Sequence, residues 1–103
     1  MIEFYEARAV TAARVAEDGE IVAPWAFAFD DRFIMVVGPP SYIDNGDVSE
    51  LAIDDEVLVF DRRTGKISEE LVGPDSDIAK RSGELDLVGD ADAYQRWQQL
   101  RDR

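Results

Sequence analysis

The chain offers few residue types that could perform nucleophilic, acid–base or metal chemistry. It contains no cysteine and no histidine, which excludes a cysteine nucleophile, a Ser-His-Asp triad and metal binding through thiolate or imidazole. Its 23 Asp and Glu residues form carboxylate pairs by chance in any fold, so such pairs do not indicate a glycosidase-like site. No glycine-rich phosphate-binding loop is present. The sequence therefore predicts a protein that is not an enzyme and that binds no cofactor.

The acidic residues are concentrated in one segment. Residues 41–60 carry six acids and no base, which is half of the net charge of −12. The segment lacks the ligand spacing of an EF-hand, so we expect no metal site there. Three interpretations remain open: a solvated loop, adaptation to high salt, and a docking face for a basic partner. Clustering favours docking over salt adaptation, because salt adaptation should spread acids over the whole surface. The candidate partner-binding residues are Tyr42, Asp44, Asp47, Glu50, Asp54, Asp55 and Glu56.

Aromatic side chains are the second kind of recognition candidate. Tyr42 follows Pro39-Pro40, which limit the local freedom of the chain and hence the cost of ordering it on binding. Tyrosine is also common among interface hot spots, so Tyr42 is the predicted anchor for a partner. Trp25 and Trp97 are expected in the core, because one lies in an alternating aromatic run and the other on an apolar helix face.

The elements that must position these residues follow from hydrophobic periodicity. Residues 3–16 are predicted to form a helix that ends before Gly19. Residues 39–55 are predicted to be irregular, with a turn at 44–47. Alternating or continuous apolar runs predict strands at 21–29, 33–37, 56–60 and 66–72, and a further short strand around Leu85 and Leu87.

A second helix is predicted at the carboxyl end. Asp92, with Gln95 three residues later, fits a capping box, and Asp90 is an alternative cap. Ala93, Trp97 and Leu100 then share one helical face. The predicted fold is a single α+β domain over residues 1–103: an amino-terminal helix, an antiparallel meander of four or five strands, and a carboxyl-terminal helix.

The same periodicity predicts the core and one turn. A glycine at position 65 is expected to close the hairpin between 61 and 66 in the left-handed conformation. The residues expected to be mostly buried are Ala9, Ala12, Ala16, Phe27, Phe29, Ile34, Val36, Leu58 and Phe60.

Charge and hydropathy also limit the setting in which the protein works. A net charge of −12 makes nucleic acid and anionic membranes poor partners, because both would be repelled. The longest uncharged run, residues 33–43, is shorter than the roughly 20 residues of a membrane-spanning helix. The first residues show no signal-peptide pattern. We expect a cytoplasmic protein.

Part of the chain resembles a known family. The resemblance covers roughly residues 3–72 and rests on the runs Trp25–Asp30, Phe33–Val37 and Val57–Ile67, with Gly46-Asp47 before the last run. These are similar to the YrhB-like family, also called the immunity protein 35 family of bacterial polymorphic-toxin systems. The chain departs from the family at Asp54-Asp55-Glu56, where members often carry a proline or small residues. The resemblance implies a small cytoplasmic antitoxin that binds and neutralises a toxin made by the same cell, and it supplies no catalytic residues.

Three functions follow as hypotheses. The first is an immunity-type protein whose acidic segment binds a basic toxin surface. The second is a chaperone-like or regulatory protein-binding module that uses an exposed sheet edge. The third is a small enzyme with an unrecognised carboxylate site. A toxin gene immediately upstream would favour the immunity-type protein. Binding of many unfolded clients without charge preference would favour the protein-binding module, and turnover of a small molecule would favour the enzyme.

Overall fold

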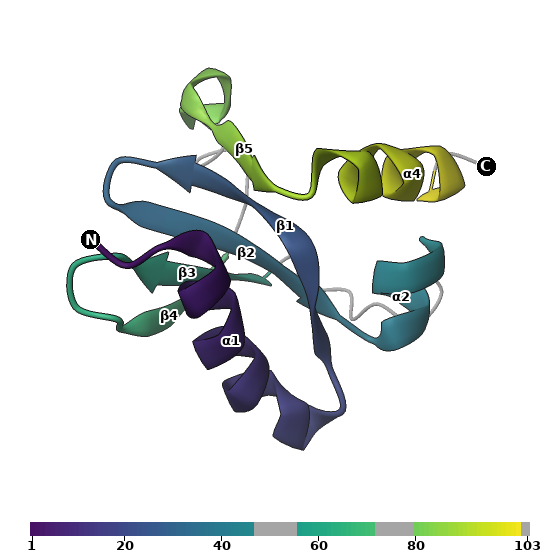
Figure 1. Ribbon diagram of the computed structural model, residues 1–103, viewed down its shortest axis with the longest axis horizontal. Helices are drawn as coiled ribbons and strands as arrows, with labels where there is room; N and C mark the ends of the chain where they lie inside the picture. Colours follow the sequence, from purple (N-terminus) through teal and green to yellow (C-terminus); the bar gives the residue numbers. More distant parts are fainter. Residues whose placement is uncertain (47–55, 72–79, 102–103) are drawn as a thin grey trace.

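The computed structural model describes residues 1–46, 56–71 and 80–101, and the structural statements below concern these residues. Five antiparallel strands form one sheet in the order β4-β3-β2-β1-β5 (Figure 1). The strands are β1 (Ile21–Phe29), β2 (Arg32–Gly38), β3 (Glu56–Asp61), β4 (Ile67–Leu71) and β5 (Asp86–Gly89). The first four strands follow one another as a meander, and β5 pairs with β1 at the opposite side of the sheet. The predicted α+β fold, with a helix at either end of the chain, is confirmed.

Helices pack on both faces of the sheet. The first face is covered by α1 (Phe4–Val15), which continues into the short 3-10 helix η1 (Ala16–Asp18). Part of the second face is covered by α2 (Pro40–Asn45) and α4 (Ala91–Arg101) (Figure 1). A second 3-10 turn, η3 (Ser82–Glu84), precedes β5. Because neighbouring strand residues point to opposite faces, Ala26 packs in the α1 cluster and Trp25 in the α2–α4 cluster.

The rotation of α1 differs from the prediction. Its buried face consists of Phe4, Ala7, Thr11 and Val15. Ala9 and Ala16, which were expected in the core, are exposed, and Ala12 is half-buried. An alanine methyl group buries little surface, so the larger Phe4 and Val15 side chains determine which way the helix faces.

A bulge in β1 shapes both faces of the sheet. The register of β1 against β2 shifts between Val22 and Ala26, and Pro24 lies within this shift. Proline has no N–H to donate to a strand ladder, which is why it is found at bulges. Arg8 of α1 satisfies backbone groups there, because its guanidinium donates to the carbonyl oxygens of Ala23 and Val22, each at 3.1 Å. The bulge is therefore held by the helix that covers it.

Most of the expected strand core is confirmed. Phe29, Ile34, Leu58 and Phe60 are buried, whereas Phe27 and Val36 are only half-buried. The predicted hairpin turn is also confirmed. Gly65 has φ +76°, its N–H donates to Asp61 O at 2.8 Å, and the Asp61 N–H donates to Lys66 O at 2.9 Å.

Part of the predicted irregular segment is helical. Residues 40–45 form α2, with Pro40 at its first position and Gly46 after its last turn at φ +71°. Proline costs nothing at a helix start, because the first N–H groups have no partner within the helix. The remainder of the segment, residues 47–55, lies outside the described residues.

The cap of α4 is Asp90, the alternative prediction, and not Asp92. The Asp90 Oδ1 accepts a hydrogen bond from the Ala93 N–H at 3.0 Å, and its carbonyl accepts one from the Tyr94 N–H at 3.2 Å. Asp92 falls within the first turn of the helix. Within the described ranges, no helix is both long and apolar enough to cross a membrane.

Candidate functional site

The structure describes only part of the predicted partner-binding set. Tyr42 and Asp44 lie on α2, and Glu56 begins β3. Asp47, Glu50, Asp54 and Asp55 lie outside the described residues. The part of the acidic segment that can be examined is therefore α2 and its surroundings.

Tyr42 belongs to the contact between α2 and α4. Its side chain is half-buried, and its ring meets the Trp97 ring edge-on, with centroids 5.4 Å apart. The Trp97 Nε1–H donates to the backbone carbonyl of Tyr42 at 3.0 Å. An isolated helix of six residues such as α2 is unstable, so this tertiary packing must hold it.

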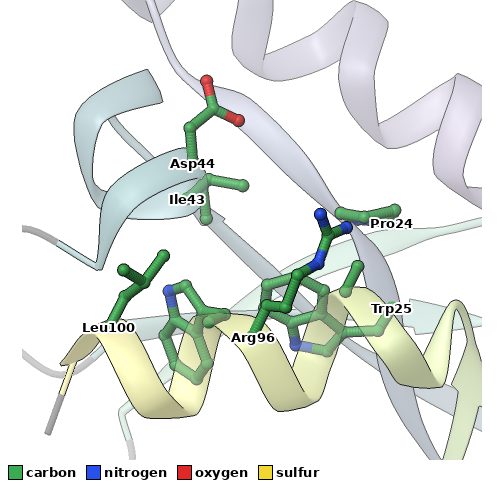
Figure 2. A pocket seen from close by; sticks show the side chains of 8 residues that line it. Pro24, Trp25, Ile43, Asp44, Arg96 and Leu100 are labelled. Carbon is green, nitrogen blue, oxygen red and sulfur yellow. The ribbon is translucent and has the colours of Figure 1, made fainter.

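A pocket lies between α2, α4 and the bulged part of β1. We call it the α2–α4 pocket; it has a volume of about 260 Å³. Figure 2 shows the side chains around it, which come from three separate parts of the sequence. The lining residues are Pro24, Trp25, Ile43, Asp44, Ala93, Arg96, Trp97 and Leu100.

The apolar wall of the pocket is an aromatic cluster. Trp25 and Trp97 have ring centroids 5.2 Å apart, and Tyr94 lies 5.8 Å from Trp25 and 6.3 Å from Trp97. The Arg101 guanidinium also lies over the Trp97 ring, 4.5 Å from its centroid. These contacts hold the two indoles in place, so the wall is formed before any ligand arrives.

One polar atom in this wall has no partner. Trp25 is 1% exposed, and its Nε1–H has no hydrogen-bond acceptor in the part of the chain that the structure describes. A buried donor without an acceptor costs roughly 1–3 kcal/mol.

Two opposite charges flank the pocket. Asp44 is exposed on α2 and Arg96 is exposed on α4. In Figure 2 the Arg96 side chain extends from α4 toward the space between Asp44 and Pro24. Among the described residues, neither Asp44 nor Arg96 forms an ion pair. No described side chain therefore neutralises either charge.

At the other end of the sheet, near the β1–β2 turn, charged groups are paired. Arg81 donates to both carboxylate oxygens of Asp30, at 2.8 and 3.0 Å, and to those of Glu84, at 2.8 and 3.1 Å. These hydrogen bonds lower the pKa values of Asp30 and Glu84 and raise that of Arg81. The Arg32 and Arg81 guanidiniums also lie over the Phe29 ring, at 4.4 and 4.9 Å from its centroid. This arrangement connects the β1–β2 turn to η3 and has a structural role.

The described lining of the pocket offers apolar side chains and two opposite charges, which are groups that can bind a ligand. Among the described residues, the ionisable side chains that line it are Asp44 and Arg96, and none of the lining side chains is a nucleophile. The described residues also contain no group of three acidic side chains that could hold a metal ion. Sequence reasoning missed Arg96 and the role of Pro24. A charged residue directly before Trp97, on the helix face predicted to pack, was the one available signal.

Comparison with protein-family models, curated proteins and solved structures finds no match for this chain.

Proposed function

We propose that the protein is a non-enzymatic, immunity-type protein that binds and neutralises a basic bacterial toxin in the cytoplasm. One observation carries the proposal: residues 41–60 hold six acids and no base. Such a concentration of one sign attracts a basic partner and increases the rate of association by roughly 10- to 1,000-fold. The resemblance of residues 3–72 to the YrhB-like family agrees with this function.

Two further features support binding over catalysis. The chain lacks histidine and cysteine, and the described side chains that line the α2–α4 pocket include no nucleophile. Asp44 is exposed, and no side chain in the described part of the chain forms an ion pair with it. Tyr42 lies on the same short helix, half-buried, and its exposed part could contact a partner beside Asp44.

The test begins with identification of the partner. Affinity purification from the native cell, followed by mass spectrometry, supplies candidates, and the purified partner is then titrated with the protein. A neutralised variant carries the following substitutions: Asp44→Asn, Asp47→Asn, Glu50→Gln, Asp54→Asn, Asp55→Asn and Glu56→Gln. A matched control removes the same charge from exposed acids elsewhere: Glu3→Gln, Glu6→Gln, Glu17→Gln, Asp18→Asn, Glu69→Gln and Asp86→Asn.

We expect the neutralised variant to associate more slowly than the control, although both carry the same net charge. The wild-type rate should fall with added salt, because the Debye length shrinks from about 10 Å at 0.1 M to about 3 Å at 1 M. Co-production of the wild-type protein should also restore growth of cells that make the partner. Equal association rates and equal salt dependence for the two variants would show that the acidic segment is only a solvated surface.

A second candidate is a protein-binding module that uses a sheet edge. The observation that favours it is the position of β4, whose outer side has no neighbouring strand in the described sheet. Glu69 and Glu70 of β4 oppose strand addition by an apolar partner, because charges on edge strands discourage it. Binding of unfolded clients at a rate independent of salt would support this function over the first.

A further inference from the structure

We propose that the α2–α4 pocket binds a small zwitterion: a free α-amino acid with an apolar side chain. The inference goes beyond the proposed function, because it concerns a small molecule and not the toxin. It rests on the size of the pocket, on its aromatic wall and on the two charges at its rim.

The size of the pocket limits the class of ligand. Its volume of about 260 Å³ lies just below the roughly 300–1,000 Å³ typical of pockets for drug-sized molecules. A single amino acid is of a suitable size.

The lining selects for an apolar side chain. Six of the eight lining residues carry apolar or aromatic side chains: Pro24, Trp25, Ile43, Ala93, Trp97 and Leu100. The indoles of Trp25 and Trp97 are held by their contacts with Tyr94 and with each other, so a ligand does not have to order them. Because Trp25, Trp97 and Ile43 are only 1%, 6% and 5% exposed, a branched aliphatic or aromatic side chain would replace water mainly against the half-buried Pro24, Ala93 and Leu100.

The rim selects for opposite charges on one ligand. Arg96 can take a carboxylate through two parallel N–H···O bonds, and Asp44 can accept hydrogen bonds from an ammonium group. The two groups lie on different helices, α4 and α2, and have no partner of their own within the described residues. A simple anion would be repelled by a chain of net charge −12, whereas a zwitterion carries no net charge.

The chain carries its own probe for this binding. It has two tryptophans, Trp25 and Trp97, and both line the pocket. Tryptophan fluorescence therefore reports on the pocket alone. L-Leucine, L-isoleucine, L-methionine and L-phenylalanine do not fluoresce in the tryptophan range, so each can be added to the purified protein, with calorimetry as an independent measurement.

Three comparisons test the assignment of the charges. N-acetyl-L-leucine amide keeps the side chain and lacks both charges. Arg96→Gln removes the predicted carboxylate partner, and Asp44→Asn removes the predicted ammonium partner. The matched controls are Lys80→Gln and Asp92→Asn, exposed charges outside the pocket lining. All four substituted residues are exposed, and circular dichroism checks that each variant folds.

We expect a saturable change in fluorescence with at least one of the four amino acids and a stoichiometry of one. Arg96→Gln and Asp44→Asn should each weaken binding by about tenfold or more, which corresponds to 1.4 kcal/mol. The controls should bind as the wild type does. The wild-type protein should bind N-acetyl-L-leucine amide no more tightly than the two pocket variants bind L-leucine.

Three results would overturn the proposal. The first is no saturable binding of any of the four amino acids by either method. The second is binding of N-acetyl-L-leucine amide as tight as that of L-leucine. This result would mean that the pocket binds an apolar side chain of a partner protein. The third is weaker amino-acid binding by Arg96→Gln with unchanged binding by Asp44→Asn. This result would mean that the pocket recognises a simple carboxylic acid. None of these results depends on toxin binding, so failure here is distinguishable from failure of the proposed function.

Discussion

At the scale of single residues, Glu20 shows how burial, together with nearby acidic side chains, acts on stability. Glu20 lies between η1 and β1 and is partly buried. Burial, followed by repulsion from Asp18 and Glu69, raises its pKa above the usual 4.5. The folded protein therefore binds the Glu20 proton more tightly than the unfolded chain does. The stabilisation that protonation provides is lost as pH rises through the unfolded and then the folded pKa.

Glu20→Gln should accordingly increase the free energy of unfolding at pH 7. The gain should be less than about 1 kcal/mol, because the side chain is still reached by solvent. It should disappear below about pH 3, where the wild-type carboxyl group is protonated in both states. Denaturant unfolding at a series of pH values measures this. Glu17→Gln, which removes the same charge from an exposed side chain of η1, is the matched control. An equal gain in the control would mean that only net charge matters.

At the scale of elements, the close contact between α2 and α4 depends on a single glycine. Gly46 follows α2 at φ +71°, and a Cβ placed there would lie 2.7 Å from the backbone nitrogen of Arg101. Gly19 has nearly the same φ, +73°, yet a Cβ there would meet nothing within 4 Å. The two positions share the same backbone strain and differ in steric contact.

Gly46→Ala should therefore destabilise the protein more than Gly19→Ala does. The left-handed conformation costs roughly 1–3 kcal/mol at either position, and overpacking against α4 should add about 1–3 kcal/mol at Gly46 alone. Denaturant midpoints measure both changes. The tryptophan emission of Gly46→Ala should also shift, because the last turn of α4 must move away from α2. Equal destabilisation of the two variants would show that α4 can adjust at no cost.

At the scale of the whole molecule, the net charge of −12 must oppose folding through self-repulsion. Added salt screens this repulsion, with a Debye length of about 30 Å at 0.01 M and about 8 Å at 0.15 M. Tm should therefore rise over this range of sodium chloride and change less above it. If the acidic composition instead reflects adaptation to high salt, the protein should be unfolded at 0.15 M and fold only near molar salt. Thermal unfolding followed by circular dichroism separates these outcomes.

The sequence alone was sufficient for the terminal helices and the strands of this protein and for their order, but it missed the short helix α2. The two terminal helices, the strands of the sheet, the Gly65 turn and the burial of Trp25 and Trp97 follow from spacing patterns a few residues long. These patterns are informative because a strand or helix repeats its buried positions at a fixed period, whatever packs against it. The acidic segment was equally evident, because charge counts do not depend on the fold.

The sequence pattern allows several arrangements of these helices and strands, and only the tertiary structure shows which one is adopted. The helical pattern of α1 allowed more than one rotation, and packing of Phe4 selected the one that exposes Ala9. The α2–α4 pocket needs the bulge at Pro24, a short helix after β2 and the approach of Gly46 to Arg101. The pocket lining and the approach of Gly46 to Arg101 join residues far apart in the chain, and local periodicity carries no information about such contacts. Arg96 and Asp44 therefore look like ordinary surface charges in the sequence, and only the fold places them at the rim of one pocket.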